Sequence, residues 1–178
     1  MITLVTGGAR SGKSNFAESL LENRDDVVYI ATSIVADKEM EERVKHHKDN
    51  RPSIWRTFEG YTDLDSAVGS EEYYLLECLT VMTSNIMYDY SKDYERIPDE
   101  IQKQIEDVTV SEIKKLLDRI KSEGKQLIIV TNEVGSSIVP LDHISRVYRD
   151  VVGRVNQRVA ALSDSAYLVV CGLEVKLK

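Results

Sequence analysis

The chain has 178 residues, 42% hydrophobic and 30% charged, with nine glycines and three prolines, which predicts one globular domain over residues 1–178 and excludes a collagen-like or mainly disordered chain. A formal net charge of −7 argues against broad electrostatic binding to nucleic acid or anionic membranes. The two isolated cysteines indicate neither a zinc site nor a disulfide framework, and this cysteine usage favours a reducing cytoplasm. No apolar run is long enough to predict a membrane-spanning helix.

Short runs rich in Val, Ile and Tyr predict the strands of a mostly parallel sheet. These runs are Ile2–Thr6, Val27–Ala31, Trp55–Phe58, Tyr73–Glu77, Gln126–Thr131 and Ala166–Val170. Most are apolar at nearly every position, as expected of strands buried on both faces. A last run, Glu174–Leu177, is expected to return as an antiparallel edge strand. With helical stretches between the runs, the chain is predicted to be an α/β protein with helices on both faces of the sheet.

The loop after the first run carries the strongest motif. Its residues Gly7, Gly8, Ala9, Arg10, Ser11, Gly12, Lys13 and Ser14 satisfy the pattern GxxxxGK[ST] between a predicted strand and a predicted helix. Glycines let backbone N–H groups approach phosphate, Lys13 can reach the β- and γ-phosphates, and Ser14 can ligate Mg²⁺. An ordinary Gly-rich turn is the alternative, but the flanking elements favour a nucleotide-binding P-loop.

Apolar residues at helical spacing predict the other elements. Helices are expected behind the P-loop, at Asp37–Asp49, from a capping Thr62 to Val68, at Leu79–Tyr90, from Ile101 to Ile120, and around Val147–Val159. Ser91–Asp99 is the predicted exposed loop. On the last helix Arg146, Asp150, Arg154 and Arg158 form a charged stripe. It is either a solvated face with i,i+4 ion pairs, or a subunit interface or anion contact.

A pair of histidines, His46 and His47, stands at the cationic end of the Asp37–Asp49 helix. Adjacent helical positions face about 100° apart, so one shared metal ion is disfavoured. A surface histidine beside a half-buried one is the ordinary explanation. The neighbouring Lys48 and Arg51 could instead pair with a triphosphate, and a neutral imidazole is a competent nucleophile.

A P-loop site needs a second carboxylate near its metal, normally at the end of a neighbouring strand. Glu77 ends the run Tyr73–Glu77, and the carboxyl ends of parallel strands meet at one edge of the sheet. Glu133, after the run Gln126–Thr131, is in a comparable position. Glu77 is the predicted metal-site carboxylate, and Glu133 is the rival candidate. The alternative interpretation of Glu77 is a solvated carboxylate at a strand end with no metal role.

Several ordered motifs together resemble one family nearly end to end, the bifunctional adenosylcobinamide kinase / adenosylcobinamide-phosphate guanylyltransferases. The motifs are LVTGGARSGKS at 4–14, YIATS at 29–33, HHKDNRP at 46–52, WRT at 55–57, LLECLT at 75–80, VTNEVG at 130–135, IVP at 138–140 and RDVVGRVNQRVA at 149–160. The double histidine followed by KDxRP is the most specific of them. We therefore expect a P-loop NTPase fold of the RecA-like type.

The resemblance implies two reactions on one scaffold. In the first, the γ-phosphate of ATP or GTP passes to the aminopropanol hydroxyl of adenosylcobinamide. In the second, a histidine attacks the α-phosphate of GTP, and the substrate phosphate then takes the GMP to give adenosylcobinamide-GDP. The resemblance places the covalent histidine in the pair, and we assign it to His47, with His46 as the second candidate.

The resemblance also implies further site residues and an assembly. Expected to help hold GTP are Ala31, Thr32, Ser33, Lys48, Asp49, Asn50, Arg51, Glu59 and Glu77. The resemblance further implies that Ser14 and Glu77 bind Mg²⁺. It also implies that the protein is a homotrimer.

Two other functions use the same P-loop. A regulatory GTP-binding switch would transfer no group to a metabolite, and the sequence has no NKxD-type guanine motif, for which Thr131–Val134 is a poor substitute. A simple small-molecule kinase would need no covalent intermediate and would leave the histidine pair without a role.

Overall fold

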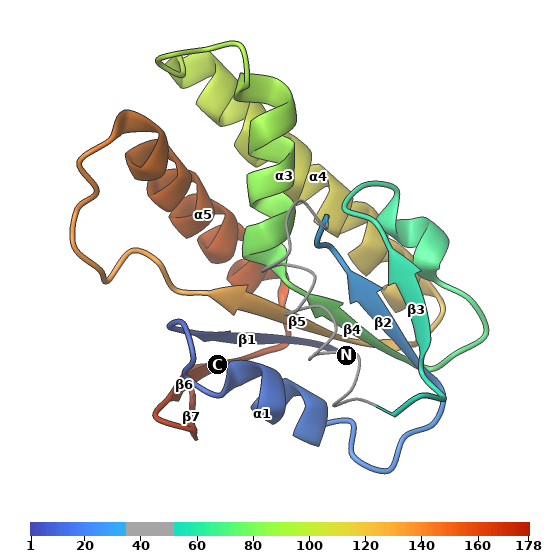
Figure 1. The fold of residues 1–178 in the computed structure, drawn as a ribbon. Helices are drawn as coiled ribbons and strands as arrows, with labels where there is room; N and C mark the ends of the chain where they lie inside the picture. The colour runs from blue at the N-terminus through green and yellow to red at the C-terminus, as the bar shows by residue number, and fades with distance from the viewer. Residues whose placement is uncertain (35–51) are drawn as a thin grey trace.

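The structure, a computed structural model, describes residues 1–34 and 52–178. Seven strands form one sheet in the order β3-β2-β4-β5-β1-β6-β7, in which neighbouring strands are parallel except for the antiparallel pair β6 and β7. The strands are β1 (Ile2–Gly7), β2 (Val27–Ala31), β3 (Arg56–Glu59), β4 (Tyr73–Glu77), β5 (Gln126–Asn132), β6 (Ser165–Val170) and β7 (Leu173–Lys176). The mostly parallel sheet with an antiparallel final strand is confirmed (Figure 1).

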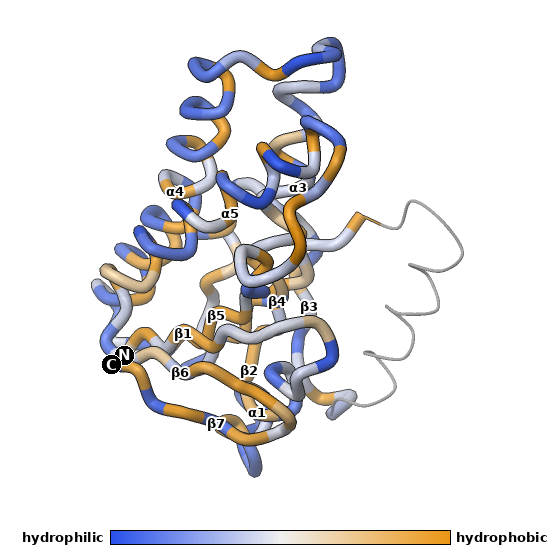
Figure 2. The backbone as a smooth tube through the Cα atoms, turned by 90° about the vertical axis from the view of Figure 1, so that its left-hand side faces the viewer, coloured by the Kyte–Doolittle hydropathy of each residue, from blue (hydrophilic) through white to orange (hydrophobic). Residues whose placement is uncertain are grey.

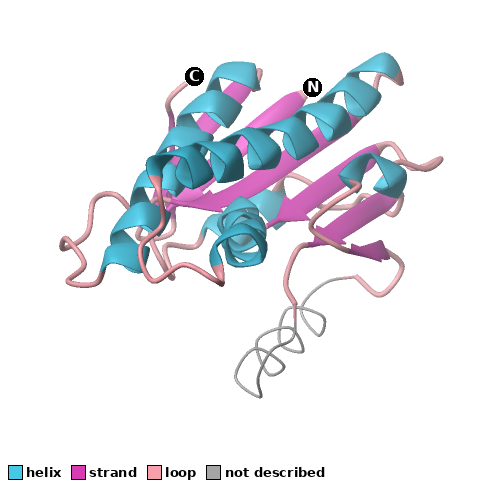
Figure 3. Cartoon of the chain, turned by 90° about the horizontal axis from the view of Figure 1, so that it is seen from above, coloured by secondary structure: helices cyan, strands magenta, loops and turns pink. Residues whose placement is uncertain are grey.

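Helices cover both faces of this sheet, as predicted (Figure 1). They are α1 (Lys13–Ser19) on one face, and α3 (Leu79–Ser91), α4 (Asp99–Ser122) and α5 (His143–Leu162) on the other. Seen from above, the long helices cross over the strands (Figure 3). The predicted helix Asp37–Asp49 lies outside the described residues. No helix in the two described stretches is both long and apolar enough to cross a membrane.

Several predicted strand ends differ by one residue from the structure, and three of the predicted elements differ for identifiable local reasons. β3 begins at Arg56, because Trp55 belongs to a turn in which its backbone N–H donates to Pro52 O. β7 begins at Leu173, because Cys171 and Gly172 make a tight turn with positive φ and pairing resumes at once. The predicted helix from Thr62 is a 3₁₀ turn, η1 (Leu64–Ala67), preceded by Asp63 and without a side-chain cap.

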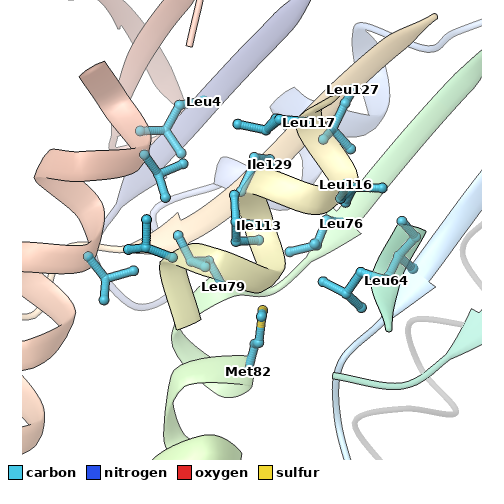
Figure 4. Packing of buried hydrophobic residues seen from close by; sticks show 14 of the residues in the cluster. Leu4, Leu64, Leu76, Leu79, Met82, Ile113, Leu116, Leu117, Leu127 and Ile129 are labelled. Atoms are coloured by element: carbon cyan, nitrogen blue, oxygen red, sulfur yellow. The ribbon is translucent and has the colours of Figure 1, made fainter. Parts of the chain in front are cut away.

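The period-two alternation along each strand divides the core into two clusters. On β1, β2 and β4, even-numbered residues such as Leu76 and Ile30 face α3, α4 and α5, whereas odd-numbered residues such as Leu75 and Val5 lie in a smaller cluster with α1. On β5 the numbering is reversed, so odd-numbered Ile129 belongs to the larger cluster. Figure 4 shows the larger cluster, in which Leu76 and Ile129 from the sheet meet helical side chains. Along α4, hydrophobic and hydrophilic residues alternate with the helical period (Figure 2).

Parallel register aligns the strand ends that matter for function. Gly7 pairs with Asn132, while Ala31 pairs with both Glu77 and Glu59. The last residues of five parallel strands therefore share one edge of the sheet, the edge where open α/β sheets bind ligands.

Leu116→Ala tests the packing of α4 on the sheet. Leu116 is fully buried in the larger cluster, so its truncation should lower the free energy of unfolding by about 2–5 kcal/mol, as measured by urea denaturation. Leu141→Ala is the matched control: Leu141 is 99% exposed, and its change should stay within about 0.5 kcal/mol. Equal effects of the two substitutions would contradict the packing described.

Candidate functional site

The P-loop turns tightly between β1 and α1. Ser11 N–H donates to Gly8 O at 3.3 Å, and Gly12 has φ +96°, a left-handed conformation that favours glycine. A Cβ added to Gly7 would lie 2.5 Å from both Ser11 Oγ and Val169 O, so only glycine fits there. This close winding is what a phosphate-binding loop requires.

Lys13 lies over the loop that it follows. Its Nζ donates to Gly8 O at 3.3 Å, so the ammonium group is held at the loop's own backbone. The Oγ of Ser11 is buried and has no hydrogen-bond partner in the described part of the chain. The loop thus combines a cation with a buried hydroxyl.

Ser14 and Glu77, the predicted metal-site pair, lie in contact. Ser14 Oγ donates to Glu77 Oε1, and Tyr29 OH donates to Glu77 Oε2 at 3.0 Å. The rival Glu133 instead accepts from Gly135 N–H at 2.6 Å, within its own turn. The geometry therefore favours Glu77 over Glu133 as the carboxylate that faces the P-loop.

These two oxygen groups suit a hard divalent cation that takes its remaining ligands from phosphate and water. Within residues 1–34 and 52–178, no group of three or more His, Cys, Asp and Glu side chains could hold a metal ion. A metal site built by the protein alone is therefore not found in this part of the chain.

Thr32 ties the end of β2 to the end of β4. Its N–H donates to Glu77 O at 3.2 Å, and its Oγ lies 2.9 Å from both the N and the O of Cys78. Its own carbonyl accepts from Asn85 Nδ2 at 2.8 Å. Thr32 is buried and its polar groups are engaged, so the geometry gives it a structural role at this edge.

The other residues predicted to hold nucleotide divide into two groups. Ala31 and Glu59 lie at the carboxyl ends of β2 and β3, where their Cα atoms pair, and the half-buried Ser33 follows two residues after Ala31. Lys48, Asp49, Asn50 and Arg51, like the candidate nucleophiles His46 and His47, lie outside the described residues.

A polar network behind this edge was missed at the sequence level. Asn132 Nδ2 donates to Thr80 Oγ1 at 2.8 Å, and Thr80 Oγ1 lies 2.7 Å from Cys78 Sγ. Tyr148 OH donates to Thr80 O at 3.1 Å, and Asn156 Nδ2 donates to Asn132 O at 3.0 Å. Asn132 ends β5 in the motif VTNEVG, and Thr80 lies in the first turn of α3 in the motif LLECLT. Their places near the carboxyl ends of β5 and β4 could have signalled them.

Burial keeps the ionisable members of this network neutral. Desolvation raises the pKa of the Cys78 thiol and raises the pKa of Tyr148 to about 12. Both groups therefore act as hydrogen-bonding rather than charged groups near pH 7.

The charged stripe of α5 pairs with α4. Arg154 Nε lies 2.7 Å from Glu106 Oε2, and Arg158 Nη1 lies 2.8 Å from Asp107 Oδ1 and 3.1 Å from Glu106 Oε1. Of the alternatives for this stripe, i,i+4 pairs within the helix do not describe these two arginines, because their partners come from the neighbouring helix. A hollow of about 430 Å³ between α4 and α5 is lined by Asp99, Gln102, Lys103, Glu106 and Arg154.

The two cysteines should differ in reactivity. Because the thiolate is the nucleophile, the raised pKa and burial of Cys78 should protect it from iodoacetamide at pH 8, whereas the exposed Cys171 should react. Mass spectrometry should find one label per native chain and two after unfolding. Cys171→Ser is the control and should leave the native chain unlabelled; rapid labelling of Cys78 in that variant would contradict its burial.

Comparison with known proteins identifies the family. The family model described as "Cobinamide kinase / cobinamide phosphate guanyltransferase" matches residues 3–177. Relatives named "Bifunctional adenosylcobalamin biosynthesis protein CobU" are 44% identical over 183 residues in Escherichia coli and 42% over 193 residues in Salmonella typhimurium, covering 100% of both chains in each case. A relative from Pseudomonas aeruginosa, "Bifunctional adenosylcobalamin biosynthesis protein CobP", is 34% identical and covers 100% of this chain and 98% of its own.

Among solved structures, a KaiC-like protein from Pyrococcus horikoshii OT3 aligns with a TM-score of 0.43 and 13% identity, covering 94% of this chain and 69% of that chain. The family assignment rests on the sequence matches, which extend over essentially the whole chain. By these matches, the chain belongs to the cobinamide kinase / cobinamide phosphate guanyltransferase family.

Proposed function

We propose that the chain phosphorylates adenosylcobinamide with ATP or GTP and then transfers GMP from GTP to the new phosphate, giving adenosylcobinamide-GDP. Family membership supports both reactions, since close relatives are named as bifunctional adenosylcobalamin biosynthesis proteins. The observation that carries the proposal is the contact of Ser14 with Glu77 beneath a tightly wound P-loop.

The described residues support specific roles in phosphoryl transfer. Lys13 neutralises charge on the β- and γ-phosphates, and the P-loop backbone surrounds them. Glu77 accepts a hydrogen bond from the Ser14 hydroxyl, which leaves the lone pairs of Ser14 Oγ for a metal ion. Bound Mg²⁺ supplies positive charge to the phosphates.

The guanylyl transfer proceeds in two displacements. A ring nitrogen of His47 forms a bond to the α-phosphorus of GTP as the bond to the bridging oxygen breaks and pyrophosphate leaves. An oxygen of the cobinamide phosphate then attacks the same phosphorus and releases the imidazole. His46 is the second candidate, and Lys48, Asp49, Asn50, Arg51 and Glu59 help to hold GTP by resemblance to the family.

Two further expectations stay predictions. The homotrimer comes from the resemblance alone, and the cytoplasmic location comes from the cysteine usage and the lack of long apolar runs. Size-exclusion chromatography with light scattering checks the first by giving three times the mass of one chain.

Incubation with GTP labelled at the α- or the γ-phosphate tests the covalent step. The α-label alone should stay on the denatured protein, with the acid lability and alkali stability of a phosphoramidate. His47→Ala should abolish the label and His46→Ala should retain it. The reverse result would move the nucleophile to His46. No label in the unaltered protein would exclude the guanylyl-enzyme and leave a plain kinase or a GTP-binding switch.

Lys13→Ala tests whether one site serves both reactions. Loss of the ammonium group should lower both the kinase rate and the rate of GMP-enzyme formation by about 100-fold, as measured in separate assays. Lys114→Ala, a change at an exposed lysine of α4, is the control and should preserve both rates. Normal GMP-enzyme formation in Lys13→Ala would contradict the shared site.

A further inference from the structure

Tyr29 contacts the carboxylate that faces the P-loop. Its hydroxyl donates to Glu77 Oε2 at 3.0 Å, while Ser14 Oγ donates to Oε1. Glu77 is therefore bonded through both oxygens, by donors from two different elements, β2 and α1. A carboxylate held in this way keeps one side-chain orientation, because rotation would break both hydrogen bonds.

The sheet register explains why Tyr29 reaches Glu77. Ala31 pairs with Glu77, so Tyr29, two residues earlier on β2, lies diagonally across from it on the same face of the sheet. This face also packs against α1, the helix that carries Ser14. One face of the sheet thus gathers the three residues.

Packing fixes the tyrosine ring. Tyr29 is only 6% exposed and belongs to the smaller core cluster with Val5, Ala17 and Leu75. The hydroxyl is consequently presented from a rigid support and not from a surface side chain. Such outer hydrogen-bond partners orient metal-site groups, and their loss typically costs about 10–100-fold in metal affinity.

We propose that Tyr29 is a positioning residue for the metal-dependent nucleotide site, because its hydroxyl holds Glu77 in the orientation that accepts the hydrogen bond of the Ser14 hydroxyl. Tyr29 itself touches neither nucleotide nor metal in this role. The inference rests on the proposed P-loop nucleotide site. It adds to that site a residue that sets the Mg²⁺ concentration at which nucleotide binding is half-saturated.

Tyr29→Phe removes the hydroxyl and retains the ring. Binding of a fluorescent GTP analogue should be titrated at a series of Mg²⁺ concentrations and also in EDTA. The half-saturating Mg²⁺ concentration should rise about tenfold, while the affinity in EDTA stays within about twofold of the unaltered protein. Binding of Mn²⁺ to the nucleotide complex, followed by electron paramagnetic resonance, should weaken by the same factor.

Tyr74→Phe is the matched control. Tyr74 is fully buried on the same strand as Glu77, but it faces the other way, and its hydroxyl bonds to Gly69 and Glu71. This variant should keep the normal Mg²⁺ response, even where it lowers thermal stability. High Mg²⁺ should also restore the kinase rate of Tyr29→Phe but not that of Lys13→Ala.

Two results would overturn the inference while leaving the nucleotide site in place. One is an unchanged Mg²⁺ response in Tyr29→Phe. The other is an equal loss of affinity with and without Mg²⁺, which would make Tyr29 a packing residue only. If instead the unaltered protein bound GTP equally well in Mg²⁺ and in EDTA, the metal assignment to Ser14 and Glu77 would itself fail, and the role of Tyr29 with it.

Discussion

The parallel alignment of β1, β5, β4 and β2 is the constraint on which the site depends. Gly7 is level with Asn132, and Glu77 is level with both Val130 and Ala31. Since parallel strands end together, residues up to about 125 positions apart in the chain meet at one edge. Both faces of the sheet are packed with apolar side chains, so this edge is where the strands can offer polar groups to a ligand. The Ser14–Glu77 contact is a direct consequence of that alignment.

Much of this arrangement could be predicted from local sequence. Strands buried on both faces are apolar without interruption, and the bounds of β2 and β4 agree with their apolar runs. The Ser14–Glu77 pairing followed from two motifs and one topological rule. By contrast, the sequence places Tyr29 in an apolar strand and at the start of the motif YIATS, and neither pattern indicates a contact with Glu77. Its contact with Glu77 depends on the register of β2 against β4, which no local pattern specifies.

The arginines of α5 show the same limit. A repeat of four residues indicates correctly that Arg154 and Arg158 share one side of the helix, but it cannot tell which charges face them. Glu106 and Asp107 on α4 provide the partners, and Arg158 accordingly lowers the pKa of the Asp107 carboxyl. These partly exposed pairs orient one helix against the other and contribute little net stability. Their side chains are occupied within the chain, which weakens the anion-contact interpretation of the stripe.

The antiparallel final strand also has a consequence for the P-loop. β6 and β7 form a hairpin, so the chain turns directly at the carboxyl end of β6. β6 is parallel to β1, so this turn lies at the same edge of the sheet as the end of β1. The turn at Cys171 and Gly172 therefore lies against the P-loop, where Gly172 N–H donates to Ser11 O at 2.8 Å. A Cβ on Gly12 would come within 3.1 Å of Gly172 Cα, so the two backbones are in close contact. A crossover to a further parallel strand would carry the chain away from this edge through a long connection. The short hairpin instead keeps the Gly172 N–H against the P-loop. Because β1 lies between β5 and β6, the hairpin supports the P-loop on the β6 side.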